Sequence, residues 1–573
     1  MSASALLASV DGRWLIDTAA MRRISNEIVD ALQTPKRPSS AIPTRSPFPG
    51  CLPADAFLLV ILSVPSLYVL LSLPPLWRDA DGFNEIASTF APKGIIHWLP
   101  GYCLGGRLIV FAGSIVGSLL GGHGIPYLSI SITPLNDTGI YTLVGVQHLF
   151  LVVSLFYAVK ALSNHFQMRV VFAVFFALTP WVYIYANCIG SEAFSNPLVY
   201  LIAACGWNCL RTAELDRRKV FIYFGLLLAA ALTRQINGLL TAALPIALAP
   251  LAGKELILRG RTANSTNGPS RFRYTRRFAI FVVVGLTAIG ASVLVQQTMC
   301  WLCRVPFRST LGETFEWRLN YLEELPEQER IAILARIAAK LDDPVVTESL
   351  DALNRSLNQG EKWANMFLFY KIDEILVRSG LNEMQRRTWQ IDLKLNRIAR
   401  CVLLSGEPHF LKAVWTDFMR SPFFTQTDLA YPPFILTDWL QTQLPYPRYG
   451  RLRGLATFQH EEGYCSAAWK RMPYVHLYDG IPMLVMGILT IAFGGMALIR
   501  AGGDRIAEEG ASYAIGMIVV GVLVSLANCL STFLGARFYL PVYSLFQMGF
   551  LLTISLAGNV LLRRLGRGKT GKL

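Results

Sequence analysis

The chain has 573 residues, of which 53% are hydrophobic and only 16% are charged, and its mean hydropathy is +0.41. Soluble domains carry about 25% charged residues, so this composition excludes an ordinary soluble protein and indicates a polytopic membrane protein. The formal net charge of +15 would suggest nucleic-acid binding in a soluble chain. Here much of the excess lies in short loops between apolar runs, as in oriented membrane proteins, so we expect no nucleic-acid partner.

The first 54 residues contain no long apolar run, and 33–49 is rich in Pro, Ser and Thr. We expect a cytoplasmic tail over 1–54 that is partly disordered. A membrane span needs about 20 apolar residues. Apolar runs suited to spans follow at 56–76, 104–122, 140–162, 168–186, 193–210, 221–252, 278–302, 480–500, 513–534 and 538–562. They predict an all-α polytopic fold with about ten transmembrane helices.

Charge sets the predicted topology. The N-terminal tail, 211–219, 254–277, 500–505 and the C-terminal tail are basic, so all five should be cytoplasmic. They can be so only if 104–122 does not cross the bilayer. That segment contains Arg107 and has four glycines within 105–117, and we predict a re-entrant or surface-lying helix there. The run 221–252 is too long for one helix and has Arg234 at its middle, so it predicts two short spans joined by a hairpin.

These assignments predict five parts in chain order. The N-terminal tail precedes a transmembrane region over 55–303 that includes the first outer loop. A soluble extracytoplasmic insertion occupies 304–478, where helical periodicity at 319–341 and 372–404 predicts mostly helices over the outer face of the membrane. The C-terminal transmembrane helices cover 479–563, and a basic cytoplasmic tail covers 564–573.

An acidic stretch directly follows the first apolar run and contains Asp79, Asp81 and Glu85, with His97 further on. Carboxylates beside lipid are costly, so they are usually either in water or part of a site. The stretch is therefore either a solvated loop at the membrane boundary or a functional loop. A partly desolvated carboxylate there could act as a general base, or Asp79 and Asp81 could hold a divalent cation.

Other ionisable residues lie at predicted outer helix ends in apolar sequence. Arg234 and Arg537 suit a lipid phosphate, because arginine forms paired hydrogen bonds to phosphate, although an interfacial arginine can also merely extend its charge to water. Phe538 and Tyr539 follow Arg537 directly. Glu192 either joins the same site or only caps the helix that it begins. The topology places all these groups on the outer face, where they can converge.

Five short motifs occur in an order that resembles the GT-C superfamily of membrane glycosyltransferases, which includes protein O-mannosyltransferases and the aminoarabinose transferase of lipid A. The motifs are Asp79-Ala80-Asp81, Trp98-Leu99-Pro100-Gly101-Tyr102, Ser191-Glu192, Ala231-Leu232-Thr233-Arg234-Gln235-Ile236-Asn237 and Ala536-Arg537-Phe538-Tyr539-Leu540-Pro541. Residues 406–411 also resemble a segment of related proteins. The resemblance covers roughly 55–565. The sequence departs from the family in lacking the Asp-Glu pair of the mannosyltransferases and in its large insertion.

The resemblance implies an inverting transfer of a sugar from a polyprenyl-phosphate donor to an extracytoplasmic glycan, lipid or protein. It implies that Asp81, or else Asp79, is the general base and that Arg234, Arg537 and Tyr539 bind the donor phosphate. Glu85, His97, Arg107 and Glu192 would support the site. No metal ligand set is assigned, and a cation at Asp79 and Asp81 stays open. We expect a multi-pass protein of a bacterial plasma membrane whose site faces the exterior.

Two other functions remain open. A polysaccharide polymerase or ligase would share the polytopic fold, the large outer loop and the arginines, but would not need the early acidic motif. A transporter would show internal repeats and charges at the middle of the membrane. The sequence shows no clear repeat, and its charges cluster at helix ends.

Overall fold

The computed structural model describes residues 9–10, 13–14, 52–77, 99–121, 135–212, 214–261, 272–302, 304, 307, 311–361, 368–442, 454–458, 463–476, 480–500, 504–532 and 535–570. Residues 1–53 form one compact unit and residues 54–573 form a second. In the first unit, β1 (Ser9–Val10) pairs antiparallel with β2 (Arg13–Trp14), a contact that the sequence did not predict.

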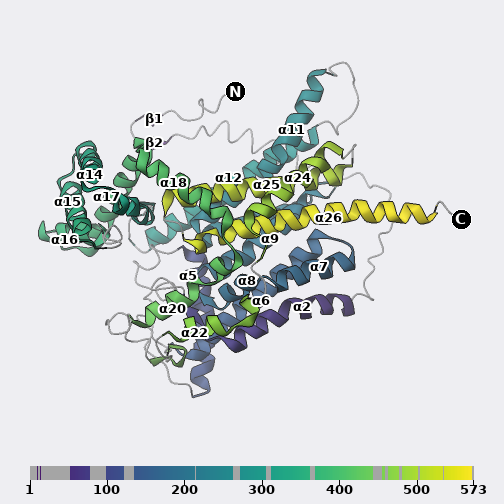
Figure 1. The fold of residues 1–573 in the computed structure, drawn as a ribbon, viewed down its shortest axis with the longest axis horizontal. Helices are drawn as coiled ribbons and strands as arrows, with labels where there is room; N and C mark the ends of the chain where they lie inside the picture. Colours follow the sequence, from purple (N-terminus) through teal and green to yellow (C-terminus); the bar gives the residue numbers. More distant parts are fainter. Residues whose placement is uncertain are drawn as a thin grey trace. The chain divides into compact units, whose positions relative to one another are not determined.

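The second unit is built around a bundle of long helices (Figure 1). The bundle and its connecting helices comprise α2 (Leu52–Ser72), α5 (Pro100–Leu119), α6 (Asp137–Leu162), α7 (Phe166–Ala177), α8 (Pro180–Ala186), α9 (Glu192–Leu210), α10 (Arg217–Thr233), η2 (Gln235–Ala242), α11 (Ala243–Arg261), α12 (Arg273–Leu302), α24 (Met483–Arg500), α25 (Arg505–Ser531), η9 (Ala536–Tyr539) and α26 (Leu540–Thr570). Two short strands, β3 (Leu76–Trp77) and β4 (Cys188–Ile189), join two of its loops.

Seven described helices are long and apolar enough to cross a membrane, and there are up to eight if the bent pair α7 and α8 forms one span. The polytopic all-α class predicted from the sequence is thereby confirmed. The prediction of about ten spans also counted the regions of α9, α10 and α24. The structure forms helices in all three, but α10 has only 17 residues and α24 is among the shorter apolar helices.

The helix predicted not to cross the membrane is α5, which is continuous over 20 residues and meets the length and composition expected of a span. Where α5 packs along α6, the contacts described are with the first half of α6, since Tyr102 donates a hydrogen bond to Gln147 and Gly117 lies against Asn136. The second half of α6 packs beside α2, where Lys160 pairs with Asp55. A hairpin of α5 with half of α6 is compatible both with a span and with a re-entrant helix. That α5 does not cross the membrane therefore stays a prediction.

The predicted break near Arg234 is confirmed. Helix α10 ends at Thr233, Arg234 is extended with φ −147° and ψ 135°, and the 3-10 helix η2 leads into α11. Side-chain caps define several other helix starts. Asn136 accepts a hydrogen bond from the Gly139 N–H at the start of α6, and Asp504 accepts one from the Ile506 N–H at the start of α25.

One end of the bundle, which we call the basic end, gathers three arginines around Glu509, two from the start of α12 and one from the start of α25. This carboxylate is 0% exposed and lies 3.3 Å from Arg273, 3.6 Å from Arg277 and 3.1 Å from Arg505. Arg277 also donates to the carbonyl of Leu210 at the end of α9. Three of the five basic connections thus meet at one end of the bundle. This agrees with the prediction that all five lie on the same side of the membrane.

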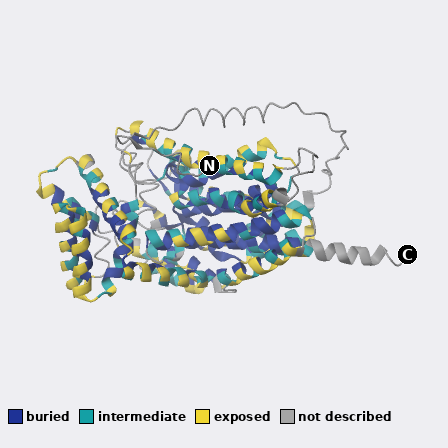
Figure 2. Ribbon diagram, turned by 90° about the horizontal axis from the view of Figure 1, so that it is seen from above, coloured by how far each residue is buried: buried dark blue, intermediate teal, exposed yellow. Residues whose placement is uncertain are grey.

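Residues 311–476, the insertion, lie in the chain between α12 and α24. We call the end of the bundle opposite the basic end the insertion end. Their helices are α13 (Leu311–Glu316), η4 (Trp317–Glu324), α14 (Glu327–Leu341), α15 (Pro344–Asn358), α16 (Leu368–Arg378), α17 (Met384–Ser405), α18 (Pro408–Arg420), η6 (Ser421–Phe423), α19 (Gln426–Ala430), α20 (Pro432–Thr442), η8 (Ala456–Phe458), α22 (Tyr464–Arg471) and α23 (Pro473–His476). The mostly helical character predicted for the insertion agrees with these elements. Figure 2 shows exposed residues on the outward faces of these helices and buried residues through the bundle.

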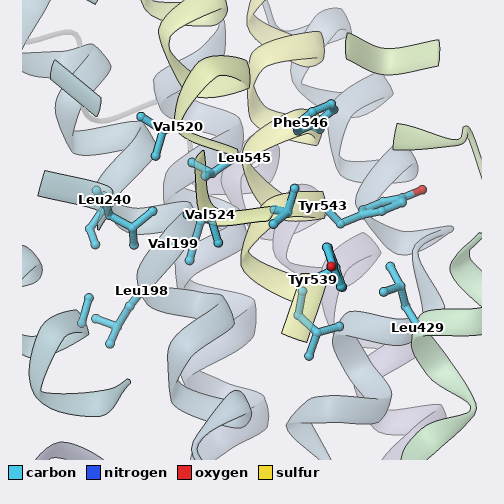
Figure 3. Packing of buried hydrophobic residues seen from close by; sticks show 14 of the residues in the cluster. Leu198, Val199, Leu240, Leu429, Val520, Val524, Tyr539, Tyr543, Leu545 and Phe546 are labelled. Atoms are coloured by element: carbon cyan, nitrogen blue, oxygen red, sulfur yellow. The ribbon is translucent and has the colours of Figure 1, made fainter. Parts of the chain in front are cut away.

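A continuous hydrophobic core joins the insertion to the bundle. Figure 3 shows Val199 of α9, Val524 of α25 and Tyr543 of α26 in this core, with Leu429 of α19 beside Tyr539. All five side chains are almost completely buried. Burial of apolar area stabilises this contact at roughly 25 cal/mol per Å². The segment containing α19 therefore rests on the insertion end of α26.

Candidate active site

The candidate site is organised by the two strands β3 and β4. They pair in parallel, with Leu76 opposite Cys188 and Trp77 opposite Ile189, and all four residues are buried. Parallel strands end at the same edge. The acidic stretch that starts with Asp79 follows β3 by two residues, and Ser191-Glu192 follows β4 by the same interval.

Four of the predicted site residues lie outside the part of the chain that the structure describes. They are Asp79, Asp81, Glu85 and His97.

Contacts from distant segments hold the strand pair in place. Asn187 Nδ2 donates to the carbonyl of Pro74 at 2.7 Å, and the Leu76 N–H donates to the carbonyl of Asn187 at 2.9 Å. On the other side, the Trp77 N–H donates to Thr437 Oγ1 of α20 at 2.8 Å. The edge is therefore fixed by the loop before α9 and by the insertion.

Tyr102 of α5 fixes the turn that carries Glu192. Its hydroxyl accepts from the Gly190 N–H at 2.9 Å and donates to Gln147 Oε1 of α6 at 3.0 Å. Gln147 Nε2 in turn donates to the carbonyls of Ala186 at 2.8 Å and Cys188 at 3.1 Å. This buried network ties α5 and α6 to both ends of β4.

Glu192 and Arg234 form a buried ion pair at this edge. Arg234 Nη1 lies 3.1 Å from Glu192 Oε1, and their side chains are 12% and 0% exposed. Glu192 is the first residue of α9, where the helix dipole favours a carboxylate. Arg234 reaches it because α10 ends one residue earlier.

A second polar contact lies one helical turn deeper. Asn237 Nδ2 of η2 donates to Ser195 Oγ of α9 at 3.0 Å and to the carbonyl of Ala230 at 3.1 Å. It fixes η2 against α9 and so sets the direction of Arg234. Gly101 permits the same close packing from α5, because a Cβ there would lie 2.8 Å from the Leu232 carbonyl oxygen.

The buried Tyr185 of α8 brings Arg537 into the same neighbourhood. Its hydroxyl has no hydrogen-bond partner among the described residues, and it interacts electrostatically with Glu192, Arg234 and Arg537. The Arg537 guanidinium lies 5.0 Å from the centre of the Phe538 ring. Both arginines predicted from the sequence, and Glu192 with them, are therefore among the charged side chains in the surroundings of Tyr185.

The structure gives the other two predicted residues different surroundings. Arg107 is 1% exposed within α5 and lies five residues beyond Tyr102. The Tyr539 hydroxyl is 2.9 Å from Cys529 Sγ, and its ring packs on Phe424 at 5.2 Å. Tyr539 thus packs against the insertion, and its predicted contact with phosphate stays a prediction.

Sequence reasoning missed several residues that build the site. Tyr102 is part of one of the five motifs, which give it no role, and no sequence motif indicates Gln147, Tyr185 or Thr437. Gln147 carried a usable signal, because a polar amide inside the apolar run 140–162 must find a partner within the protein. Thr437 carried none, because it contacts β3 from 360 residues away.

Among the described residues there is no group of three or more His, Cys, Asp and Glu side chains that could hold a metal ion. The residues considered for a divalent cation, Asp79 and Asp81, are outside that part of the chain.

No protein-family model matches the chain, and no curated protein matches it. Among solved structures, it is similar to the oligosaccharyltransferase of Archaeoglobus fulgidus in the apo form, with 12% identity, a TM-score of 0.40, and coverage of 91% of this chain and 52% of that one. It is also similar to the oligosaccharyltransferase AglB of the same organism in complex with an inhibitory peptide and a dolichol-phosphate, with 13% identity, a TM-score of 0.37, and coverage of 90% and 52%. The chain spans about half the length of each protein that it resembles.

Proposed function

We propose that this chain is an integral membrane glycosyltransferase that moves a sugar from a polyprenyl-phosphate donor to an acceptor at the insertion end. The observation that carries the proposal is the buried ion pair of Glu192 with Arg234, which lies beside the edge from which the acidic stretch begins. Covalent geometry keeps the Cα of Asp79 within about 8 Å of the Cα of Trp77, which is paired at that edge. A solvated boundary loop would not need this setting.

In the proposed reaction, the Asp81 carboxylate takes a proton from an acceptor hydroxyl or amine, with Asp79 as the alternative base. The acceptor atom forms a bond to the anomeric carbon as the bond from that carbon to the phosphate oxygen breaks. The electron pair leaves on the phosphate, and the configuration inverts.

Arg234 and Arg537 stabilise the phosphate as negative charge develops on it. Tyr539 also contacts the donor phosphate. Glu192 orients Arg234 through the ion pair, and Glu85, His97 and Arg107 have supporting roles. A divalent cation at Asp79 and Asp81 would assist the leaving phosphate. The acceptor is a cell-envelope glycan, lipid or protein, and the site faces the exterior of a bacterial plasma membrane.

The test compares cell-envelope glycans and lipid-linked sugars in a strain lacking this protein, restored with the wild type, with Asp81→Asn or with Asp351→Asn. Asp351 is an exposed residue of α15, so its variant makes the same chemical change away from the site. We expect the null strain and Asp81→Asn to lose one sugar and accumulate one polyprenyl-phosphate sugar, while Asp351→Asn behaves like wild type. Normal glycans with Asp81→Asn would exclude Asp81 as the base, and accumulated whole repeat units would favour a polymerase.

A second measurement addresses the donor. In purified protein, Arg537→Ala should raise the KM for the polyprenyl-phosphate sugar by about tenfold or more, because a charge-assisted contact to phosphate is lost. An unchanged KM would mean that Arg537 only extends its charge to water.

A further inference from the structure

Helix α18 carries apolar residues on two separate faces. Phe410 and Val414 are buried, at 1% and 5% exposure, and Phe410 packs on Phe315 and Tyr321. The second apolar face of α18 is exposed. There, Leu411, Trp415 and Met419 are 48%, 62% and 49% exposed.

The open residues form one stripe, because positions four apart lie on the same face of a helix. Leu404 at the end of α17 and Phe423 of η6, which flank α18 in the chain, are also exposed, at 81% and 61%. A helix that is apolar over so wide a sector is normally covered on all of it. Five large exposed side chains along one short segment also exceed the scattered apolar residues of an ordinary soluble surface.

The position of α18 indicates what covers its exposed apolar face. Its Asp417 pairs with the buried Arg318, and α18 packs against α25 near Cys529, close to the end of that helix. The following η6 packs against α24. Helix α25 is long and apolar enough to span a membrane, so α18 lies where such a span reaches the lipid surface.

The lipid-facing belt of the bundle reaches this same end. Helix α12 starts beside Glu509 at the basic end, and its 30 residues cover about 45 Å. Its last residues, Trp301 and Leu302, are 76% and 66% exposed at the insertion end. The stripe on α18 is of the same apolar character, and tryptophan is the side chain that favours the boundary between lipid and water.

The charged residues of α18 also favour contact with the lipid surface. Lys412 and Arg420 of α18 are exposed, and Lys412 borders the stripe. Basic side chains in this position can reach lipid phosphates while the apolar residues enter the acyl region.

We propose that α18 is an interfacial helix that rests on the lipid surface at the insertion end, with Leu411, Trp415 and Met419 among the acyl chains and Lys412 and Arg420 at the phosphates. The covered face of the same helix carries Asp417, next to Arg318 and the turn before α26. The bilayer therefore fixes the height of the insertion above this turn. This inference does not depend on the chemistry proposed above.

The test uses the full chain in nanodiscs of phosphatidylglycerol and phosphatidylcholine with a trace of lipid that has a photoreactive diazirine near its headgroup. After illumination, labelled tryptic peptides are mapped by mass spectrometry. Cleavage at Arg400, Lys412 and Arg420 isolates the stripe in two peptides. We expect these peptides to carry at least about fivefold more lipid than peptides of α14, because only the stripe enters the interface.

A matched pair of variants sharpens the result. Leu411→Gln, Trp415→Gln and Met419→Gln together should remove most labelling of these peptides. Ile331→Gln, Tyr370→Gln and Val377→Gln together change exposed apolar residues of α14 and α16 and should leave it unchanged.

Two results would overturn the proposal. One is labelling of the α18 peptides no higher than that of α14 while the Trp301 peptide is labelled. The other is a dominant protein–protein cross-link at the stripe, which would assign this face to a second copy of the chain. The wild-type labelling pattern decides between these results even if a variant fails to fold.

Discussion

The Tyr102 hydroxyl is the single group on which the geometry of the Glu192 turn depends most. It is an acceptor for the Gly190 N–H and a donor to Gln147, and no water in an apolar bundle can replace it. Its position directly after Gly101, where α5 lies close to α10, links the start of α5 to the Glu192 turn.

Tyr102→Phe removes this hydroxyl. Each buried group left unsatisfied costs about 1–3 kcal/mol, and we expect a lower unfolding midpoint together with slower sugar transfer, by about tenfold or more, as Glu192 loses its position. The measurements are thermal unfolding in detergent and the transfer rate. The control is Tyr141→Phe, since Tyr141 is 46% exposed on α6. Equal effects of both changes would show that the network does not position the turn.

At the residue scale, the sequence predicted Glu192, Arg234 and Arg537 because ionisable groups in apolar runs are costly and therefore rarely incidental. The same logic could not rank Tyr102, because tyrosine is common at membrane boundaries for reasons unrelated to function. Tyr539 shows that residues close in sequence can have different surroundings, since Arg537 lies in the surroundings of Tyr185 while the Tyr539 hydroxyl contacts Cys529.

At the scale of elements, Gly101 sets how closely α5 approaches α10. Gly101→Ala would place a Cβ 2.8 Å from a backbone oxygen that cannot rotate away, so the helices must separate. Overpacking of this kind costs about 1–3 kcal/mol. Gly145→Ala in α6 meets no atom within 4 Å and should be neutral or slightly stabilising, because alanine favours helix. Thermal unfolding of the two variants side by side measures the difference, and similar midpoints would contradict the packing argument.

Asp343 joins two helices of the insertion. It accepts hydrogen bonds from the Val345 and Val346 N–H groups at the start of α15 and pairs with Lys394 of α17 at 2.7 Å. Burial acts to raise the pKa of Asp343, but Lys394 and the backbone donors outweigh it and hold the pKa below its ordinary value. Its stabilising effect is therefore complete above the ordinary pKa and is lost as the pH falls through the lowered one.

Asp343→Ala should weaken α15 by about 1–2 kcal/mol, the usual value of a lost cap, and speed its amide exchange roughly five- to thirtyfold at neutral pH. The difference from wild type should shrink below about pH 4, as the carboxylate is protonated in both states. Hydrogen exchange of the full chain measures both. Asp343→Asn retains a capping oxygen without the charge, so it should fall between the two. An exchange difference that grows in acid would refute the sign of the effect.

The predictions from sequence also succeeded unevenly at this scale. Long helices such as α6 and α25 follow from their apolar length. The strands β3 and β4 have two residues each, too few to show any alternation, and their pairing comes from contacts with Asn187 and Thr437. Tertiary contacts alone create the edge on which the candidate site is built.

At the scale of the whole molecule, Glu509 holds the basic end together. Glu509→Gln would leave three arginines without their common carboxylate, and breaking buried pairs costs about 3–5 kcal/mol. Glu508→Gln is its matched control, because Glu508 pairs with Lys254, which is 59% exposed, and such pairs contribute about 0–1 kcal/mol. We expect a much larger fall in the unfolding midpoint for Glu509→Gln. Equal midpoints would mean that the arginines are held mainly by backbone carbonyls.

The overall arrangement was largely predictable because two strong physical rules govern it. Apolar length predicts where helices form, and the distribution of Lys and Arg predicts which loops share a side. The grouping of Arg273, Arg277 and Arg505 agrees with that second rule. The folding of the insertion onto the bundle was not predictable in detail, because contacts such as those of Leu429 and Asp417 depend on packing rather than on any repeated pattern.

The strand pair also has a consequence for how the protein is made. Trp77 emerges from the ribosome over a hundred residues before Ile189, and Thr437 follows Trp77 by 360 residues. At about 5–20 residues per second, Trp77 waits tens of seconds or more for the last of these partners. Helices can enter the membrane during that time, but the contacts that fix the edge of the candidate site cannot yet form. A nascent chain arrested before residue 437 should therefore be inserted yet inactive, and the site should be among the last regions to mature.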